Sequence, residues 1–170
     1  MRLTTKGRFA VTALLDMAVH AGERPVSLAE IAERQSISVA YLEQLFGKLR
    51  RAGLVVSVRG PGGGYRLARA PSEISAADIV NVVEESLDAT QCGGSNSCHH
   101  DGAECMTHEL WATLNQTLEG VLEDATLEKL VRQYEERQRL AASGIALVKI
   151  DPAAMRRGRK NSLARESHEK

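Results

Sequence analysis

The amino-acid sequence predicts a mainly α-helical fold with one small β-hairpin, and three observations support this prediction. Apolar residues recur at three- and four-residue spacing over most of residues 5–53 and 75–139, as they do on the buried face of a helix. The run Ser27–Glu30 has the Ser-x-x-Glu pattern of a capping box, which starts a helix. Residues 54–67 instead hold short β-branched runs around the glycine-rich Gly60–Gly64, which is typical of a hairpin.

Three helices are predicted before the hairpin. The first has Thr5 as its N-cap and ends at Gly22, the second begins at Ser27, and the third is capped by Ser38 or a neighbour and ends at Gly53. Their apolar faces hold Phe9, Ala10, Ala13, Leu14, Met17 and Ala18, then Leu28, Ile31 and Ala32, then Leu42, Leu45, Phe46 and Leu49. Because a tight turn at residues 35–38 joins the second helix to the third, the pair forms a helix-turn-helix.

The remaining elements complete a predicted winged helix-turn-helix domain with a helical extension. A hairpin of residues 54–58 and 65–67 directly after a helix-turn-helix is the order of a winged helix. A fourth helix follows from Ser75, and a long apolar stripe begins at Leu110, with a break near residues 124–126. We expect four segments: a winged-helix domain at 1–86, a ligand-binding loop at 87–108, a helical region at 109–139 and a disordered basic tail at 140–170.

Charge is distributed unevenly, although the formal net charge is zero. Residues 1–70 carry 11 Lys and Arg against 5 Asp and Glu, whereas residues 71–150 carry 5 against 14. A basic first part beside an acidic middle indicates a module that binds a polyanion. Solvated arginine faces on an ordinary globular domain are the plain alternative.

The third helix and the hairpin supply the candidate residues for DNA binding. The second helix of a helix-turn-helix lies in the major groove, where glutamine suits adenine and glutamate accepts from cytosine. The basic hairpin suits a minor groove or phosphates. The candidates are Ser38, Ala40, Tyr41, Glu43, Gln44, Lys48, Arg51 and Arg59, with Arg2, Thr4 and Lys6 as candidates for phosphate contacts. A winged helix used for protein contacts is the alternative.

Several function classes are excluded by motif or composition. The glycine-rich hairpin tip lacks the Lys-Ser/Thr of a phosphate-binding loop, and Tyr65 stands where a dinucleotide fingerprint needs glycine. The sequence shows no Cys-His-Asp/Asn arrangement that would activate a cysteine nucleophile, so we expect no enzymatic activity. No apolar stretch approaches the roughly 18 residues of a membrane span, and no signal peptide is legible. We therefore expect a cytoplasmic protein with no membrane partner.

All three cysteines lie within fourteen positions, Cys92, Cys98 and Cys105, and His108 follows. Thiols stay reduced in the cytoplasm, so such a cluster indicates a metal site rather than disulfides. Structural zinc sites usually carry a Cys-x2–4-Cys pair, which is missing here, whereas thiolates in a wide glycine- and serine-rich loop favour an iron–sulfur cluster. Zinc and a metal-free loop stay open as alternatives, and His99 and His100 compete with His108 as ligands.

Five stretches resemble the IscR-type iron–sulfur cluster regulators of bacteria, over residues 1 to about 134. They are Leu3–Thr12, Tyr41–Phe46, Leu49–Leu54, Ser57–Tyr65 and Met106–Trp111. The resemblance implies a homodimeric winged-helix transcription factor that binds promoter DNA with two half-sites and dimerises through the helix region at 109–139. It also implies one [2Fe–2S] cluster per subunit, held by three cysteines and a histidine and received from the iron–sulfur cluster assembly machinery. Carried over, the ligands are Cys92, Cys98, Cys105 and His108.

The resemblance further implies a sensor that acts as repressor or activator and controls cluster-assembly genes. Glu43 matches the position that disfavours one class of sites unless the cluster is bound, and Tyr41, Gln44 and Arg59 match other base- and groove-contacting positions. The gap between Cys98 and Cys105 is one residue longer than the family pattern. Related nitric-oxide-sensing repressors are one alternative, although position 8 holds Arg where those sensors carry an acidic ligand. A zinc-stabilised winged-helix adaptor is the other.

Overall fold

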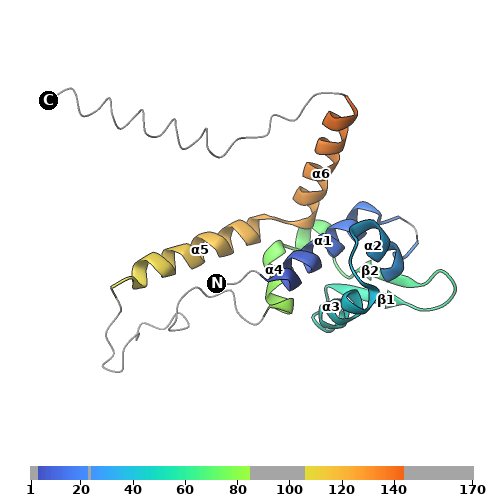
Figure 1. Ribbon diagram of the computed structural model, residues 1–170, viewed down its shortest axis with the longest axis horizontal. Coiled ribbons are helices and arrows are strands. Elements are labelled where there is room, and N and C mark those ends of the chain that lie inside the picture. Colours follow the sequence, from blue (N-terminus) through green and yellow to red (C-terminus); the bar gives the residue numbers. More distant parts are fainter. Residues whose placement is uncertain (1–3, 23, 85–105, 144–170) are drawn as a thin grey trace. The chain divides into compact units, whose positions relative to one another are not determined.

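The computed structural model describes residues 4–22, 24–84 and 106–143, and it confirms the predicted fold class (Figure 1). Its contacts divide the chain into two units, Met1–Gln133 and Tyr134–Lys170. The predicted segment boundaries at 86, 108 and 139 stay predictions. Most of the predicted tail lies outside the described residues. The elements are α1 (Thr5–Val19), α2 (Leu28–Gln35), α3 (Val39–Arg51), β1 (Val55–Val58), β2 (Gly64–Leu67), the 3-10 turn η1 (Pro71–Glu73), α4 (Ala76–Val83), α5 (His108–Asp124) and α6 (Leu127–Ala142).

Side-chain caps start the first four helices. Ser27 and Ser75 form full capping boxes with Glu30 and Asp78, and the Ser38 hydroxyl accepts from the Tyr41 amide. These bonds satisfy amides that have no partner inside the helix. The observed α1 differs from the predicted first helix at both of its ends.

The N-cap of α1 is Thr4, not Thr5, because the Thr4 hydroxyl accepts from the Lys6 amide. The same helix ends at Val19, three residues before the predicted stop at Gly22. There His20 caps α1, and its backbone amide donates to the carbonyl of Asp16. Thr4 and Thr5 are adjacent, and either one suits an N-cap. Only the backbone angles show which of the two caps the helix.

The wing is a two-stranded antiparallel sheet that is attached to the helical body. Val55 pairs with Leu67 and Val58 with Gly64 in the hairpin register. Val26 forms an isolated bridge with Tyr65, with N–O distances of 3.0 and 2.8 Å. Gly64 is required there, since a Cβ would clash with the Val26 carbonyl. The bridge attaches β2 of the wing to the segment before α2.

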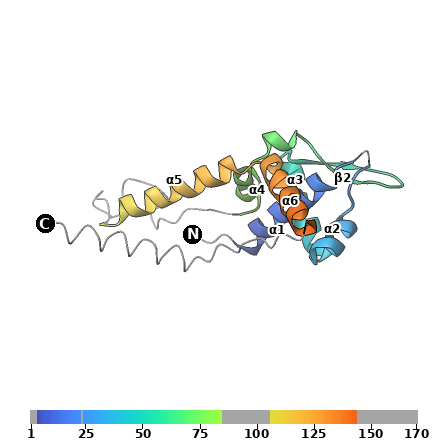
Figure 2. The ribbon, with the colours of Figure 1, turned by 90° about the horizontal axis from the view of Figure 1, so that it is seen from above.

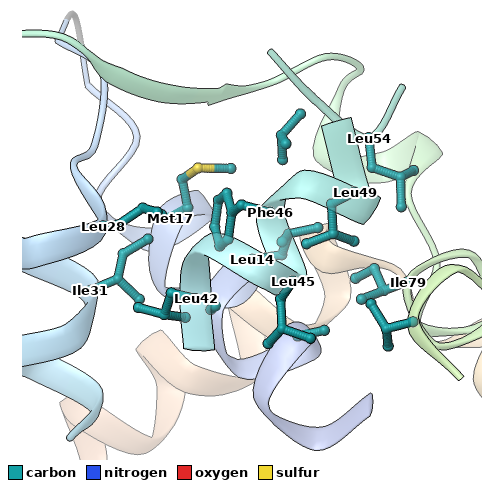
Figure 3. Packing of buried hydrophobic residues seen from close by; sticks show 14 of the residues in the cluster. Leu14, Met17, Leu28, Ile31, Leu42, Leu45, Phe46, Leu49, Leu54 and Ile79 are labelled. Carbon is teal, nitrogen blue, oxygen red and sulfur yellow. The ribbon is translucent and has the colours of Figure 1, made fainter. Parts of the chain in front are cut away.

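One hydrophobic core joins α1, α2, α3, β1 and α4. Figure 3 shows Phe46 at its centre, with Leu14 and Met17 of α1 and Ile31 of α2 around it. Phe46, Leu14 and Ile31 are fully buried. Phe46 also meets the Tyr65 ring of β2 edge to face at 4.8 Å between centroids. The third helix is thus held by the body and by β2 of the wing together.

The α4 helix lies beside α1 in both views (Figures 1 and 2), and it connects the core to the helices that follow. The Ala76 amide donates to the Ala125 carbonyl at 2.8 Å, and the Leu127 amide donates to the Ile74 carbonyl at 2.9 Å. Leu127 is fully buried in the core. The junction of α5 and α6 is therefore part of the domain.

Candidate nucleic-acid interface and ligand-binding segment

The predicted recognition helix α3 presents its polar face to solvent. Leu42, Leu45 and Leu49 are buried, so the opposite face is left outside. The candidates that are exposed there are Ser38, Ala40, Glu43, Gln44 and Arg51. Periodicity alone predicted this division, because burial of one stripe of a helix decides which residues remain accessible.

Two candidates on α3 have additional contacts inside the domain. Tyr41 is half-buried, and its ring packs edge to face on Phe9 at 5.8 Å between centroids. Lys48 is also half-buried, and its ammonium donates to the carbonyl of Val83 at 3.2 Å. The contact to Val83 could not be predicted from the sequence, because Val83 is 35 residues away from Lys48 in the chain. The DNA-binding role of both residues stays a prediction.

The orientation of the helix-turn-helix is held by a buried carboxylate that sequence analysis did not identify. The Asp16 side chain on α1 is only 1% exposed. Arg34 donates to both of its oxygens, with its shortest bond at 2.6 Å, and the Gln35 amide donates to Oδ1 at 2.7 Å. These bonds raise the pKa of Arg34, and they join α1 to the end of α2. The sequence signal that could have revealed this contact is an aspartate among the apolar residues of a helix.

The N-terminal end of α1 is held by a second carboxylate that was not predicted. Glu84, directly after α4, accepts from the Thr4 amide at 2.9 Å, the Thr4 hydroxyl at 2.6 Å and the Gly7 amide at 2.9 Å. Burial acts to raise the pKa of Glu84, but these hydrogen bonds and the charge of Lys6 outweigh it, so the pKa is lowered. Thr4 and Lys6 are candidate phosphate contacts, whereas the third candidate, Arg2, lies outside the described residues.

The wing carries its candidate residue beside the glycine-rich tip. Arg59 is exposed immediately after β1, and Arg66 is exposed on β2. The tip turns through Gly60 and Gly62, whose φ angles of 107° and 73° lie in the region that favours glycine. The Gly63 amide closes it by donating to the Gly60 carbonyl at 2.9 Å. A basic side chain on a narrow, projecting loop can enter a groove or contact phosphates.

The predicted ligand set lies almost entirely outside the described residues. Cys92, Cys98, Cys105, His99 and His100 lie outside the described residues. His108 is described, and it is the first residue of α5. Among the described residues, no group of three His, Cys, Asp or Glu side chains is placed to hold a metal ion.

The α5 helix exposes the apolar stripe that the sequence predicted. None of its residues is buried, and Leu110 and Val121 are each 62% exposed. Trp111 is 39% exposed, and its indole donates to the Thr107 hydroxyl at 3.2 Å. The other members of the stripe are half-buried, namely Leu114, Leu118 and Leu122.

Over the described ranges, no helix is long and apolar enough to cross a membrane.

Known proteins share both the sequence and the fold of this chain. It is 52% identical over 148 residues to the HTH-type transcriptional regulator IscR of Aliivibrio salmonicida, covering 84% of this chain and 88% of that protein. The solved structure of IscR from T. potens superposes with a TM-score of 0.67 at 43% identity, covering 81% of this chain and 91% of the other. CymR, the global cysteine regulator of B. subtilis, superposes at 0.68 with 37% identity, covering 78% and 98%.

Residues 3–133 match the family model Rrf2, described as an iron-dependent transcriptional regulator. The exposed polar face of α3 and the basic wing agree with that match, and many relatives of this chain are IscR proteins. The chain therefore belongs to the Rrf2 family of winged-helix, DNA-binding transcriptional regulators.

Proposed function

We propose that this protein senses iron–sulfur cluster status through a [2Fe–2S] cluster and controls promoters of cluster-assembly genes. One observation carries the proposal. Cys92, Cys98, Cys105 and His108 lie within seventeen positions of a chain that is 52% identical to an IscR protein over 148 residues. The iron–sulfur assembly machinery of the cell is the proposed source of the cluster.

The donor set fits a two-iron cluster in its chemistry. Thiolates are the usual ligands of iron–sulfur clusters, and an imidazole in place of one thiolate raises the reduction potential. When bound, the cluster supplies a redox- and iron-responsive group. His108 begins α5, so this proposed ligand is covalently continuous with the apolar stripe.

The DNA-binding surface is proposed to combine α3 with the wing. Gln44 suits adenine in the major groove, and Glu43 accepts from cytosine but repels phosphate when badly placed. Both side chains are exposed on the face of α3 opposite the core. Arg59 adds a contact from the wing tip. Glu43 would then make binding to one class of sites depend on the cluster-loaded form.

The α5 stripe is proposed to form a homodimer interface. Half of a helix-turn-helix operator is read by each subunit, so two recognition helices must be held at a fixed spacing. Leu110, Trp111 and Val121 are large apolar residues that are exposed on the described part of the chain. A second copy of the same helix would bury them in a self-complementary contact.

Anaerobic purification followed by a visible absorption spectrum and analysis of iron, sulfide and zinc tests the cofactor. We expect a coloured protein with about two irons and two sulfides per chain. Cys98→Ala should lose both the colour and the iron, while Ser95→Ala in the same segment should retain them. His108→Ala compared with His99→Ala and His100→Ala identifies the fourth ligand. Colourless protein with one zinc would refute the proposal and favour the zinc-stabilised adaptor.

Promoter binding by the loaded and cluster-free forms tests the sensing. We expect the loaded form to bind a cluster-assembly promoter more tightly, and Glu43→Ala to let the cluster-free form bind sites reserved for the loaded form. Equal affinities of the two wild-type forms at every promoter would refute sensing. If the cluster-loaded protein released DNA only on exposure to nitric oxide, that result would support the nitric-oxide-sensing alternative.

A further inference from the structure

The C-terminal end of α4 is hydrogen-bonded to α3 and to the start of α1, and both of these carry candidate DNA contacts. This α4 end consists of Val83, the last helical residue, and Glu84, its C-cap. The Val83 carbonyl accepts from Lys48 of α3, and the Glu84 carboxylate accepts from Thr4 and Gly7 at the start of α1. Two consecutive residues therefore contact both α3 and the N-terminal end of α1.

The contact of Glu84 to α1 consists of charge-assisted hydrogen bonds, which are stronger than bonds between neutral groups. A single oxygen, Oε1 of Glu84, accepts from the Thr4 amide, the Thr4 hydroxyl and the Gly7 amide at 2.6–2.9 Å. An ionised carboxylate at a helix N-terminus satisfies amides that lack helical partners and complements the helix dipole. The position of Glu84 thus decides where Thr4 and the first turn of α1 lie.

The contact to α3 uses the opposite pole of a helix. The Val83 carbonyl is among the last four of α4, which have no partner inside that helix. A lysine ammonium is favourable at such an end. Lys48 is half-buried at 3.2 Å from this carbonyl, on the helix that carries Glu43 and Gln44. A movement of the α4 end would move or break this bond as well.

The α4 end also directly precedes the proposed ligands in the chain. Cys92 follows Glu84 by eight residues. We propose that the α4 end transmits the cluster state to DNA, with Glu84 and Lys48 as positioning residues for the start of α1 and for α3. This inference rests on the proposed cluster sensing. Coupling of two sites requires an element whose position both of them bias, and these bonds make the α4 end such an element.

Promoter affinity of the loaded and cluster-free forms, measured in three variants of the full chain, tests the inference. Glu84→Gln removes the charge but keeps the shape, and Glu84→Ala removes every bond. We expect the loaded-to-free affinity ratio to fall roughly five-fold or more in Glu84→Ala, the lower range of typical coupling, and by less in Glu84→Gln. Asp78→Asn is the matched control, because Asp78 caps the other end of α4, where its carboxylate accepts from the amide and hydroxyl of Ser75. Its ratio should equal that of wild type.

Amide hydrogen exchange supplies a readout that does not depend on DNA. The Gly7 amide lies in the first turn of α1 and is bonded to Glu84 rather than to a helical carbonyl. It should be protected in wild type, lose protection in Glu84→Ala, and change its protection when the cluster is removed from wild type. A Gly7 amide that exchanges equally in both wild-type forms would overturn the inference.

The possible failures are distinguishable. A wild type whose two forms bind DNA equally refutes the proposed sensing, and the inference with it. A wild-type difference that persists in full in both Glu84→Gln and Glu84→Ala refutes the inference alone. An equal loss of affinity in the two forms of a variant also refutes it, since that result shows a structural brace without coupling.

Discussion

The winged-helix body and α5 use apolar residues in opposite ways. The body buries Phe46, Leu14 and Ile79 completely in one core. The α5 helix is longer than α2, α3 or α4, yet none of its residues is buried. Their starts differ too, because side chains cap the helices of the body, whereas Thr107 makes no capping bond at the start of α5. The body is stabilised by burial within its own core, whereas α5 exposes apolar side chains that a second copy of the chain is proposed to cover.

The largest expected effect is on the body core. Phe46→Ala should lower the free energy of unfolding by about 3–5 kcal/mol, because it removes a fully buried aromatic side chain and leaves a cavity. Urea denaturation followed by circular dichroism measures it. Leu110→Ala on α5 is the control and should cost far less at protein concentrations where the chain is monomeric. Equal losses in the two variants would contradict the comparison.

The second effect is on association. Val121→Asp should weaken the proposed dimer by roughly 2–3 kcal/mol, or about 30- to 150-fold in the dissociation constant, since it places a charge within the apolar stripe. Analytical ultracentrifugation measures the change. Gln116→Asp introduces the same charge at an exposed position off the stripe of the same helix and should leave the dissociation constant unaltered. A Val121→Asp protein that still dimerises like wild type would show that another surface is the interface.

The third effect concerns function without stability. Arg59→Ala should weaken promoter binding by about 1–3 kcal/mol if the wing contacts a groove, and leave the free energy of unfolding unchanged because the side chain is exposed. Fluorescence anisotropy with labelled promoter DNA measures the affinity. Arg132→Ala, an exposed arginine of α6, is the control for net charge. Unaltered affinity in Arg59→Ala would reduce Arg59 to a surface charge.

The smallest effect tests the local caps. Hydrogen bonds from the Ser27 amide and hydroxyl and from Arg24 lower the pKa of Glu30 to about 2. A lowered folded-state pKa means that the stabilisation is complete above the ordinary value of 4.5 and is lost as the pH falls towards 2. Wild type should therefore unfold at higher urea than Glu30→Gln at pH 7, and the difference should narrow below pH 4.5. A gap that does not depend on pH would assign the difference to shape rather than charge.

Local signals in the sequence were sufficient for most of the fold. The Ser27–Glu30 pattern placed the start of α2, and the apolar spacing of Leu42, Leu45 and Leu49 predicted which face of α3 is buried. Glycines and β-branched residues predicted the wing. Each of these signals acts between residues that are close in the chain, so periodicity and capping rules detect them.

The apolar stripe of α5 shows where local pattern ends. Helical spacing predicted the stripe from Leu110 to Leu122 correctly, but the same spacing would also suit a helix buried within one chain. Only the structure leaves Leu110 and Val121 outside the body core. Likewise, the sequence offered Lys48 as a DNA contact, and only the structure shows its bond to Val83.

What the sequence determined by itself is the order of elements, the polar face of α3 and the ligand-type residues between Cys92 and His108. What the tertiary structure decided is how distant residues meet: Arg34 with Asp16, Glu84 with Thr4, and Val26 with Tyr65. The physical reason is separation along the chain. Glu84 and Thr4 are 80 residues apart, and no periodic or capping rule relates residues at that distance, so their contact exists only once the core has brought α1 and α4 together.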